Sequence, residues 1–159
     1  MKKFDYENSI GFIVYSASKT FQKAFDLELR NKIGITLTQS KVIFSLYLNS
    51  GITQRELADK IGIESPTLVP IIDKMEEDGY VKRKSDTQDR RIKRVYTTPK
   101  TDSLWNSMIE CATHLRKIYV KDVSEQEVQS ALEIIKKITA NLTTYLEDFE
   151  DSDIKIKEK

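Results

Sequence analysis

The chain has few of the residues on which disulfide-stabilised, metal-binding and membrane-spanning proteins depend. Its 159 residues include one cysteine, Cys111, and one histidine, His114. One cysteine cannot form an intramolecular disulfide and is typical of a reducing compartment, and one histidine is too few for a nitrogen-rich zinc site. No apolar run approaches the roughly 18–20 residues of a transmembrane helix. We therefore expect a cytoplasmic protein with no bound metal and no membrane partner.

Signatures of catalysis are missing as well. The sequence holds no glycine-rich phosphate-binding loop, and its single histidine leaves no base to pair with a nucleophile and an acid. We expect a protein that is not an enzyme and that requires no cofactor. Cys111 lies on the apolar side of its segment, so we expect it to pack in a core rather than to act as a sensor. We expect His114 on the solvated surface.

What the sequence does contain is a local concentration of positive charge. The formal net charge is only +1, because an acidic segment from Glu147 to Asp153 balances it. A run of charge can be no more than a solvated surface, so its position in the fold decides what it means. Seven cations crowd one short stretch: Lys82, Arg83, Lys84, Arg90, Arg91, Lys93 and Arg94.

The hydrophobic pattern predicts a mainly α fold with a small β-hairpin. Between Tyr80 and Thr98, β-branched and aromatic residues surround a charged turn, which predicts two short strands. Elsewhere, apolar residues recur every three or four positions, as in amphipathic helices. The predicted helices run from Ile10 to near Gly34, Thr38 to Gly51, Thr53 to Ile61, Ser65 or Thr67 to Gly79, Thr98 to Ile118, and Ser124 to Phe149.

Hydroxyl side chains in front of the apolar runs predict where the helices begin. We expect Thr38 to cap the second helix and Thr53 to form a capping box at the start of the third. The fourth helix has two candidate caps, Ser65 and Thr67. Because Pro70 removes an N–H and crowds the preceding turn unless it lies in the first turn, we favour the Thr67 cap or a local bend.

The third and fourth predicted helices, joined by a tight turn at residues 62–64, resemble a helix-turn-helix, whose second helix enters the major groove of DNA. The hairpin would then be a wing. We expect Asp89 to accept from the turn backbone and to orient Arg91, whose guanidinium suits the minor groove. Helix starts can bind phosphate through free N–H groups. The residues expected to contact DNA are Thr38, Gln39, Thr53, Gln54, Ser65, Pro66, Thr67, Val69, Pro70, Lys74, Lys84, Asp89, Arg90, Arg91 and Lys93.

Three segments of this region resemble the MarR (multiple antibiotic resistance regulator) family: Thr53–Ala58 its first helix-turn-helix helix, Ser65–Val69 with Asp73–Val81 its recognition helix, and Asp89–Thr98 its wing. Pro70 and Thr97 depart from the family, which usually has a polar or basic residue and a leucine there. The resemblance implies a winged helix-turn-helix at residues 36–98 between dimerisation helices at 1–35 and 99–149. The charged tail at 150–159 is expected to be disordered.

The resemblance also implies a function. A dimeric transcriptional regulator, by the family's default a repressor, would bind a pseudo-palindromic site in double-stranded DNA and be released by a small aromatic or phenolic effector. Tyr15, Tyr47 and Trp105 are the residues that this resemblance suggests for the effector pocket, with plain core packing as the alternative. The apolar stripe from Val128 to Phe149 extends beyond the winged domain, which independently favours a homodimer. The other function to weigh is a winged-helix protein–protein adaptor without DNA binding.

Overall fold

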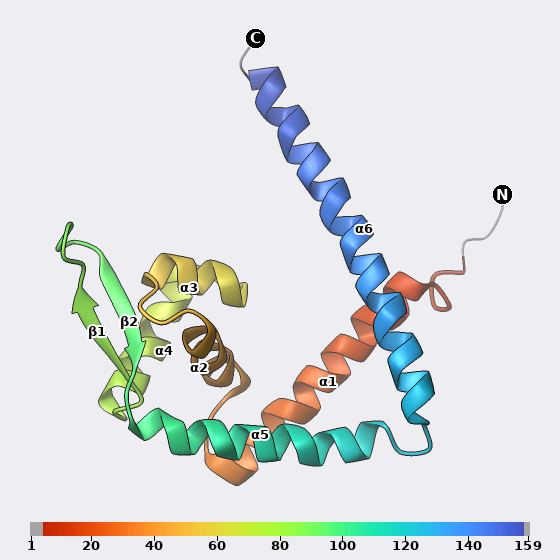
Figure 1. Ribbon diagram of the computed structural model, residues 1–159, viewed down its shortest axis with the longest axis horizontal. Coiled ribbons are helices and arrows are strands. Elements are labelled where there is room, and N and C mark those ends of the chain that lie inside the picture. The colour runs from red at the N-terminus through yellow and green to blue at the C-terminus, as the bar shows by residue number, and fades with distance from the viewer. Residues whose placement is uncertain (1–4, 158–159) are drawn as a thin grey trace. The chain divides into compact units, whose positions relative to one another are not determined.

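The computed structural model describes residues 5–157 of the chain, with side chains for residues 5–149. Over these residues it has six helices and one antiparallel two-stranded sheet (Figure 1). The elements are α1 (Ile10–Ile33), α2 (Leu37–Leu48), α3 (Gln54–Ile61), α4 (Ser65–Glu77), β1 (Val81–Ser85), β2 (Lys93–Thr97), α5 (Lys100–Tyr119) and α6 (Glu125–Lys157). The predicted class, mainly α with a small β-hairpin, and the order of elements are confirmed.

The chain divides into two compact units, Met1–Arg116 and Lys117–Lys159. In the first unit, α2, α3 and α4 gather beside the β1–β2 hairpin (Figure 1). Their apolar side chains form one core. Burying each large apolar side chain stabilises the folded state by roughly 1.5–3 kcal/mol. Members of this core with no more than 2 % of their surface exposed include Leu57, Leu68, Ile72, Met75, Val81 and Val95.

Three helix starts follow the capping-box pattern, those of α2, α3 and α6. At the start of α3, Thr53 Oγ1 accepts from the backbone N–H of Glu56 at 3.2 Å, and Glu56 accepts from the backbone N–H of Thr53 at 2.7 Å. This box was predicted. At α2 the predicted cap, Thr38, is wrong: Thr36 caps the helix and pairs with Gln39. The Thr36–Gln39 spacing fits the same S/T-x-x-E/Q signature, so the pattern was present two residues earlier.

The start of α4 also differs from the prediction. The helix begins at Ser65, and its N-cap, Glu64, makes no side-chain capping bond. Thr67 is not the cap, because its N–H already donates to the Glu64 carbonyl at 3.0 Å. Pro66 lies in the first turn, where proline favours a helix start, and Pro70 consequently lies inside the helix.

The hairpin is fastened to the loop before α3. β1 and β2 pair from Val81↔Thr97 to Ser85↔Lys93. On the other side of β2, Val95 donates to the Ile52 carbonyl at 2.9 Å and accepts from the Gly51 N–H at 3.1 Å. The wing is therefore held against the helix-turn-helix by backbone hydrogen bonds.

The second unit contains α6. Its start is capped by Ser124, whose hydroxyl accepts from the backbone N–H of Glu127 at 3.3 Å. The helix continues to Lys157, into the range where the sequence predicted a disordered tail, and residues 158–159 lie outside the described residues. In the described part of the chain, no helix is both long and apolar enough to cross a membrane.

Candidate nucleic-acid interface

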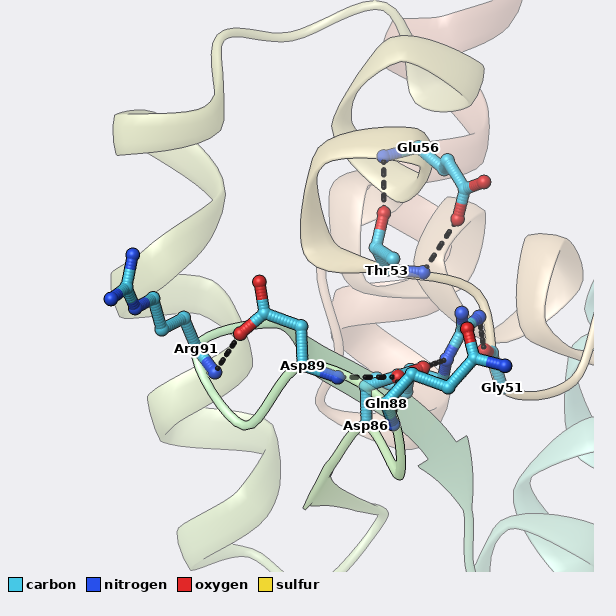
Figure 2. Close-up of polar contacts among 8 residues, drawn as sticks. Gly51, Thr53, Glu56, Asp86, Gln88, Asp89 and Arg91 are labelled. Atoms are coloured by element: carbon cyan, nitrogen blue, oxygen red, sulfur yellow. Dashed lines mark hydrogen bonds and ion pairs between the residues drawn. The ribbon is translucent and has the colours of Figure 1, made fainter.

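Asp86 organises the turn between β1 and β2. One of its carboxylate oxygens accepts from the backbone N–H groups of Gln88, at 2.8 Å, and Asp89, at 3.1 Å, while the other accepts from the guanidinium of Arg94 (Figure 2). The hydrogen bond from Arg94, followed by those from the two backbone N–H groups, lowers the pKa of Asp86 to about 2. The turn is therefore built around a carboxylate that stays ionised at neutral pH.

Asp89 and Arg91 form the tip of the wing. Asp89 Oδ1 accepts from the backbone N–H of Arg91 at 2.9 Å, so the predicted bond to the turn backbone is confirmed. The guanidinium of Arg91 points away from the other labelled residues (Figure 2). Within the described residues Asp89 and Arg91 form no side-chain ion pair, so Asp89 shapes the backbone that carries Arg91 and leaves the guanidinium available.

Two of the seven clustered cations bind other groups of the protein and so stabilise the fold. Arg94 binds Asp86 and donates from Nη1 to the Gly51 carbonyl at 2.9 Å. Arg83 binds Asp73 and Glu76 of α4, at 2.7 and 2.8 Å, and donates to Gln54 of α3 at 2.9 Å. No pattern in the sequence distinguishes these two residues, because all seven cations lie in one run.

The other five cations face solvent. Lys93 donates to the Ser85 hydroxyl at 2.7 Å, and the ammonium of Lys84 lies 5.4 Å from the ring centre of Tyr96. None of the five forms an ion pair with a carboxylate of the described residues. Such a surface attracts a polyanion. Its members are Lys82, Lys84, Arg90, Arg91 and Lys93, all exposed.

The predicted contact residues of α4 fall into two groups. The first group is exposed and consists of Ser65, Pro66, Thr67, Val69 and Pro70. The other predicted residue, Lys74, is bound by Glu77 and Asp78, each at 3.1 Å, which raises its pKa. The exposed face of the first turns is therefore uncharged, whereas the cation is neutralised by its neighbours.

The predicted contacts at the other helix starts are engaged within the protein. Thr53 and Gln39 serve the capping boxes of α3 and α2. The Gln54 side chain accepts from Arg83, and Thr38 lies inside the first turn of α2. The side chains of Thr53, Gln39 and Gln54 therefore position helices α2 and α3. The backbone N–H groups of Thr53 and Gln39 also donate within the capping boxes, so only Thr38 and Gln54 of these four residues keep a backbone N–H group suited to the predicted phosphate contact.

The residues suggested for an effector pocket are not all in one place. A cavity of about 710 Å³ lies between α1, α2 and α5, and Trp105 and Phe44 line it. Tyr47 stacks on Trp105 with ring centres 4.3 Å apart, and its hydroxyl donates to Asp102 at 2.5 Å, which raises the pKa of Tyr47 to about 12. Tyr15 is exposed on α1 and does not line this cavity.

The sequence did not single out Ser45, which also lines the cavity. Its side chain is buried, and its hydroxyl has no hydrogen-bond partner. A buried hydroxyl without a partner is costly, so this atom is a candidate contact for a polar group in the cavity. No sequence pattern marks such an atom, because only the tertiary fold determines which groups surround a buried hydroxyl.

Cys111 and His114 lie on α5. Cys111 is buried, as predicted, and burial raises the pKa of its thiol. His114 is half exposed and its Nδ1 lies 2.7 Å from Glu28, which also binds Lys32. Over the described residues, no group of three or more histidine, cysteine or acidic side chains is arranged to hold a metal ion.

Comparison with known proteins agrees with this geometry. Residues 35–93 match the model of the MarR family. The wild-type MarR of E. coli, in its apo form, has 21% identity and a TM-score of 0.76, over 82% of this chain and 96% of that one. A MarR transcriptional regulator from Methanosarcina mazei Go1 has 27% identity and a TM-score of 0.69, over 84% and 97%.

A third structure is the transcriptional repressor CouR bound to a 23-mer DNA duplex. It has 21% identity and a TM-score of 0.74, over 87% of this chain and 98% of that one. MarR-family proteins are transcription regulators and not enzymes. The winged domain of this chain therefore matches the MarR family model over residues 35–93, and the fold around it is that of MarR-family structures.

Proposed function

We propose that this chain is a homodimeric repressor of transcription that binds a pseudo-palindromic site in double-stranded DNA. The observation that carries the proposal is the wing, whose five exposed cations stand free of carboxylates beside the uncharged face of α4. In this arrangement α4 enters the major groove, Arg91 reaches the adjacent minor groove, and the remaining cations meet phosphates. The DNA complex of CouR, a protein of the same fold, supports the choice of partner.

Dimerisation is supported by apolar surface outside the winged domain. On α6, Leu132, Leu142 and Leu146 are each about half exposed, and on α1 the same holds for Ile10 and Ile13. Large exposed apolar surface usually marks an interface. A two-fold dimer would present two recognition helices to two half-sites about one DNA turn apart. We infer that residues 1–35 and 99–149 form the dimerisation module and residues 36–98 the DNA-binding domain.

A small aromatic effector is the further part of the proposal. The cavity between α1, α2 and α5 has the volume of a ligand site. Phe44 and Trp105 give it flat apolar walls, Ser45 gives it an unpaired hydroxyl, and Lys41 and Lys60 bring positive charge to its lining. A planar phenol or aromatic acid complements all three features. Because the cavity adjoins both α2 and α5, its occupant could change the position of the winged domain.

Duplex binding measured against salt tests the DNA proposal. We expect the logarithm of the binding constant to fall linearly with the logarithm of salt concentration, and Arg91→Ala to weaken binding to every duplex and reduce the slope by roughly one. Lys117→Ala is the matched control, because this cation is exposed and lies outside the winged domain. Salt-independent or absent binding by the folded wild type would favour the protein–protein adaptor instead.

A further inference from the structure

Charge is distributed unevenly along α4. Its last turns and C-cap carry four acids, Asp73, Glu76, Glu77 and Asp78, against the single cation Lys74. Lys74 is already bound by Glu77 and Asp78, and Arg83 of β1 holds the first two acids. This end of the helix therefore offers no free cation to a phosphate, and its carboxylates oppose a close approach of the DNA backbone.

The first two turns of α4 are different. Every exposed side chain from Ser65 to Pro70 is uncharged, and Val69 is 43% exposed. Apolar side chains on the solvent side of a short helix add nothing to the core, which Leu68 and Ile72 fill from the opposite side. The wing cations beside this surface attract a polyanion. The partner that matches both the cations and the uncharged helix surface is DNA, with the base edges of a groove against α4.

The two prolines of α4 stand four residues apart. In a helix the carbonyl of residue 66 accepts from the N–H of residue 70. Pro70 has no N–H, and its ring crowds that carbonyl, which it pushes away from the helix axis. Both prolines are on the exposed side of the helix. The Pro66 carbonyl therefore lacks its usual helical donor, next to the apolar surface of Val69 and Pro70.

We propose that the first two turns of α4 read A·T pairs in the major groove. The ring or methyl surfaces of Pro66, Val69 and Pro70 contact the thymine 5-methyl, and the Pro66 carbonyl accepts from the N6 amino group of adenine. An A·T pair offers both groups, whereas guanine presents only acceptors at its edge and cytosine lacks the methyl group. This inference rests on the proposed DNA binding and adds the sequence that each half-site must contain.

The experiment begins with duplexes selected from a random pool by the full-length wild-type protein. In the selected site, thymine is replaced by uracil, which removes only the methyl, and adenine by purine, which removes only the amino group. We expect at least one position in each half-site at which either change weakens binding about fivefold or more. For Val69→Ala, the replacement of thymine by uracil should weaken binding less than it does for the wild type.

Pro70→Ala isolates the carbonyl, because alanine restores the N–H that the Pro66 carbonyl lacks. We expect this variant to keep salt-dependent duplex binding but to lose the adenine-to-purine difference. Pro99→Ala, outside the winged domain, is the control and should keep it. The inference is overturned if Pro70→Ala discriminates as the wild type does, or if the selected half-sites require G·C pairs where α4 binds. Absence of all duplex binding by the folded wild type would instead overturn the proposed function itself.

Discussion

Glu76 receives two hydrogen bonds from Arg83. Its Oε1 accepts from the backbone N–H of Arg83 at 2.7 Å, and its Oε2 accepts from Nη1 of the same residue at 2.8 Å. The same guanidinium reaches Asp73 and Gln54. One residue of β1 therefore connects the wing to both helices of the helix-turn-helix, and it sets the distance between the recognition helix and the cations that flank it.

Arg83→Ala should lower the free energy of unfolding without removing a DNA contact. Hydrogen bonds to charged groups contribute about 1.5–3 kcal/mol each at most, and these are partly exposed, so we expect a loss of about 1–3 kcal/mol in total. Urea unfolding measures this loss. The salt slope of duplex binding should stay at the wild-type value, in contrast to Arg91→Ala. A shallower slope for Arg83→Ala would mean that Arg83 contacts phosphate after all.

Two constraints, a positive φ and a close approach to the wing, favour glycine at position 51. Its φ is +78°, and a Cβ there would lie 2.7 Å from the ring of Tyr96. Gly51→Ala therefore combines an unfavourable backbone conformation, about 1 kcal/mol, with a clash against the wing. Gly34→Ala is the matched control, since its φ is +71° and its surroundings are open. We expect the thermal midpoint to fall clearly further for Gly51→Ala, and equal shifts would contradict the clash.

Asp86 makes the stability of the wing depend on acid pH. Its pKa of about 2 in the folded protein lies below the ordinary value of 3.8, chiefly through Arg94. The stabilisation is therefore fully present above pH 3.8 and is lost as the pH falls toward 2. Urea midpoints of the wild type and Asp86→Asn should differ near pH 6 and converge as the pH falls through this window. A constant difference would show that the carboxylate charge plays no part.

Much of the winged domain could be predicted from the sequence, and the exceptions have physical causes. The capping box of α3 and the hairpin follow from local spacing, which determines a local hydrogen bond. The predicted start of α4 is wrong because the cost of Pro70 to a helix favours a later start, whereas the buried stripe of Leu68 and Ile72 holds the segment helical. Arg83 could not be distinguished from its neighbours, because its acidic partners are brought to it only by the tertiary fold.

Dimerisation can be tested on α6 with two substitutions of the same kind. Leu146 is 59% exposed, and Thr144 lies two residues earlier, about 160° away around the helix. We expect Leu146→Glu to shift the protein toward monomer, because a carboxylate in an apolar interface is strongly unfavourable. Thr144→Glu should stay dimeric. Sedimentation at micromolar concentration measures both, and a monomeric wild type would contradict the dimer.

The cavity can be tested with the chain's single tryptophan, Trp105, which lines it. A planar phenol such as 4-nitrophenol, bound against this ring, should quench its fluorescence in a saturable way. Ser45→Ala removes the unpaired buried hydroxyl. The phenol concentration at half-saturation should rise about fivefold or more, which corresponds to the loss of about one hydrogen bond. Ser40→Ala is the control, because its hydroxyl already donates to the Leu37 carbonyl at 2.8 Å. If both variants saturate as the wild type does, Ser45 does not contact the phenol. Quenching that never saturates would mean that the cavity does not bind this class of ligand.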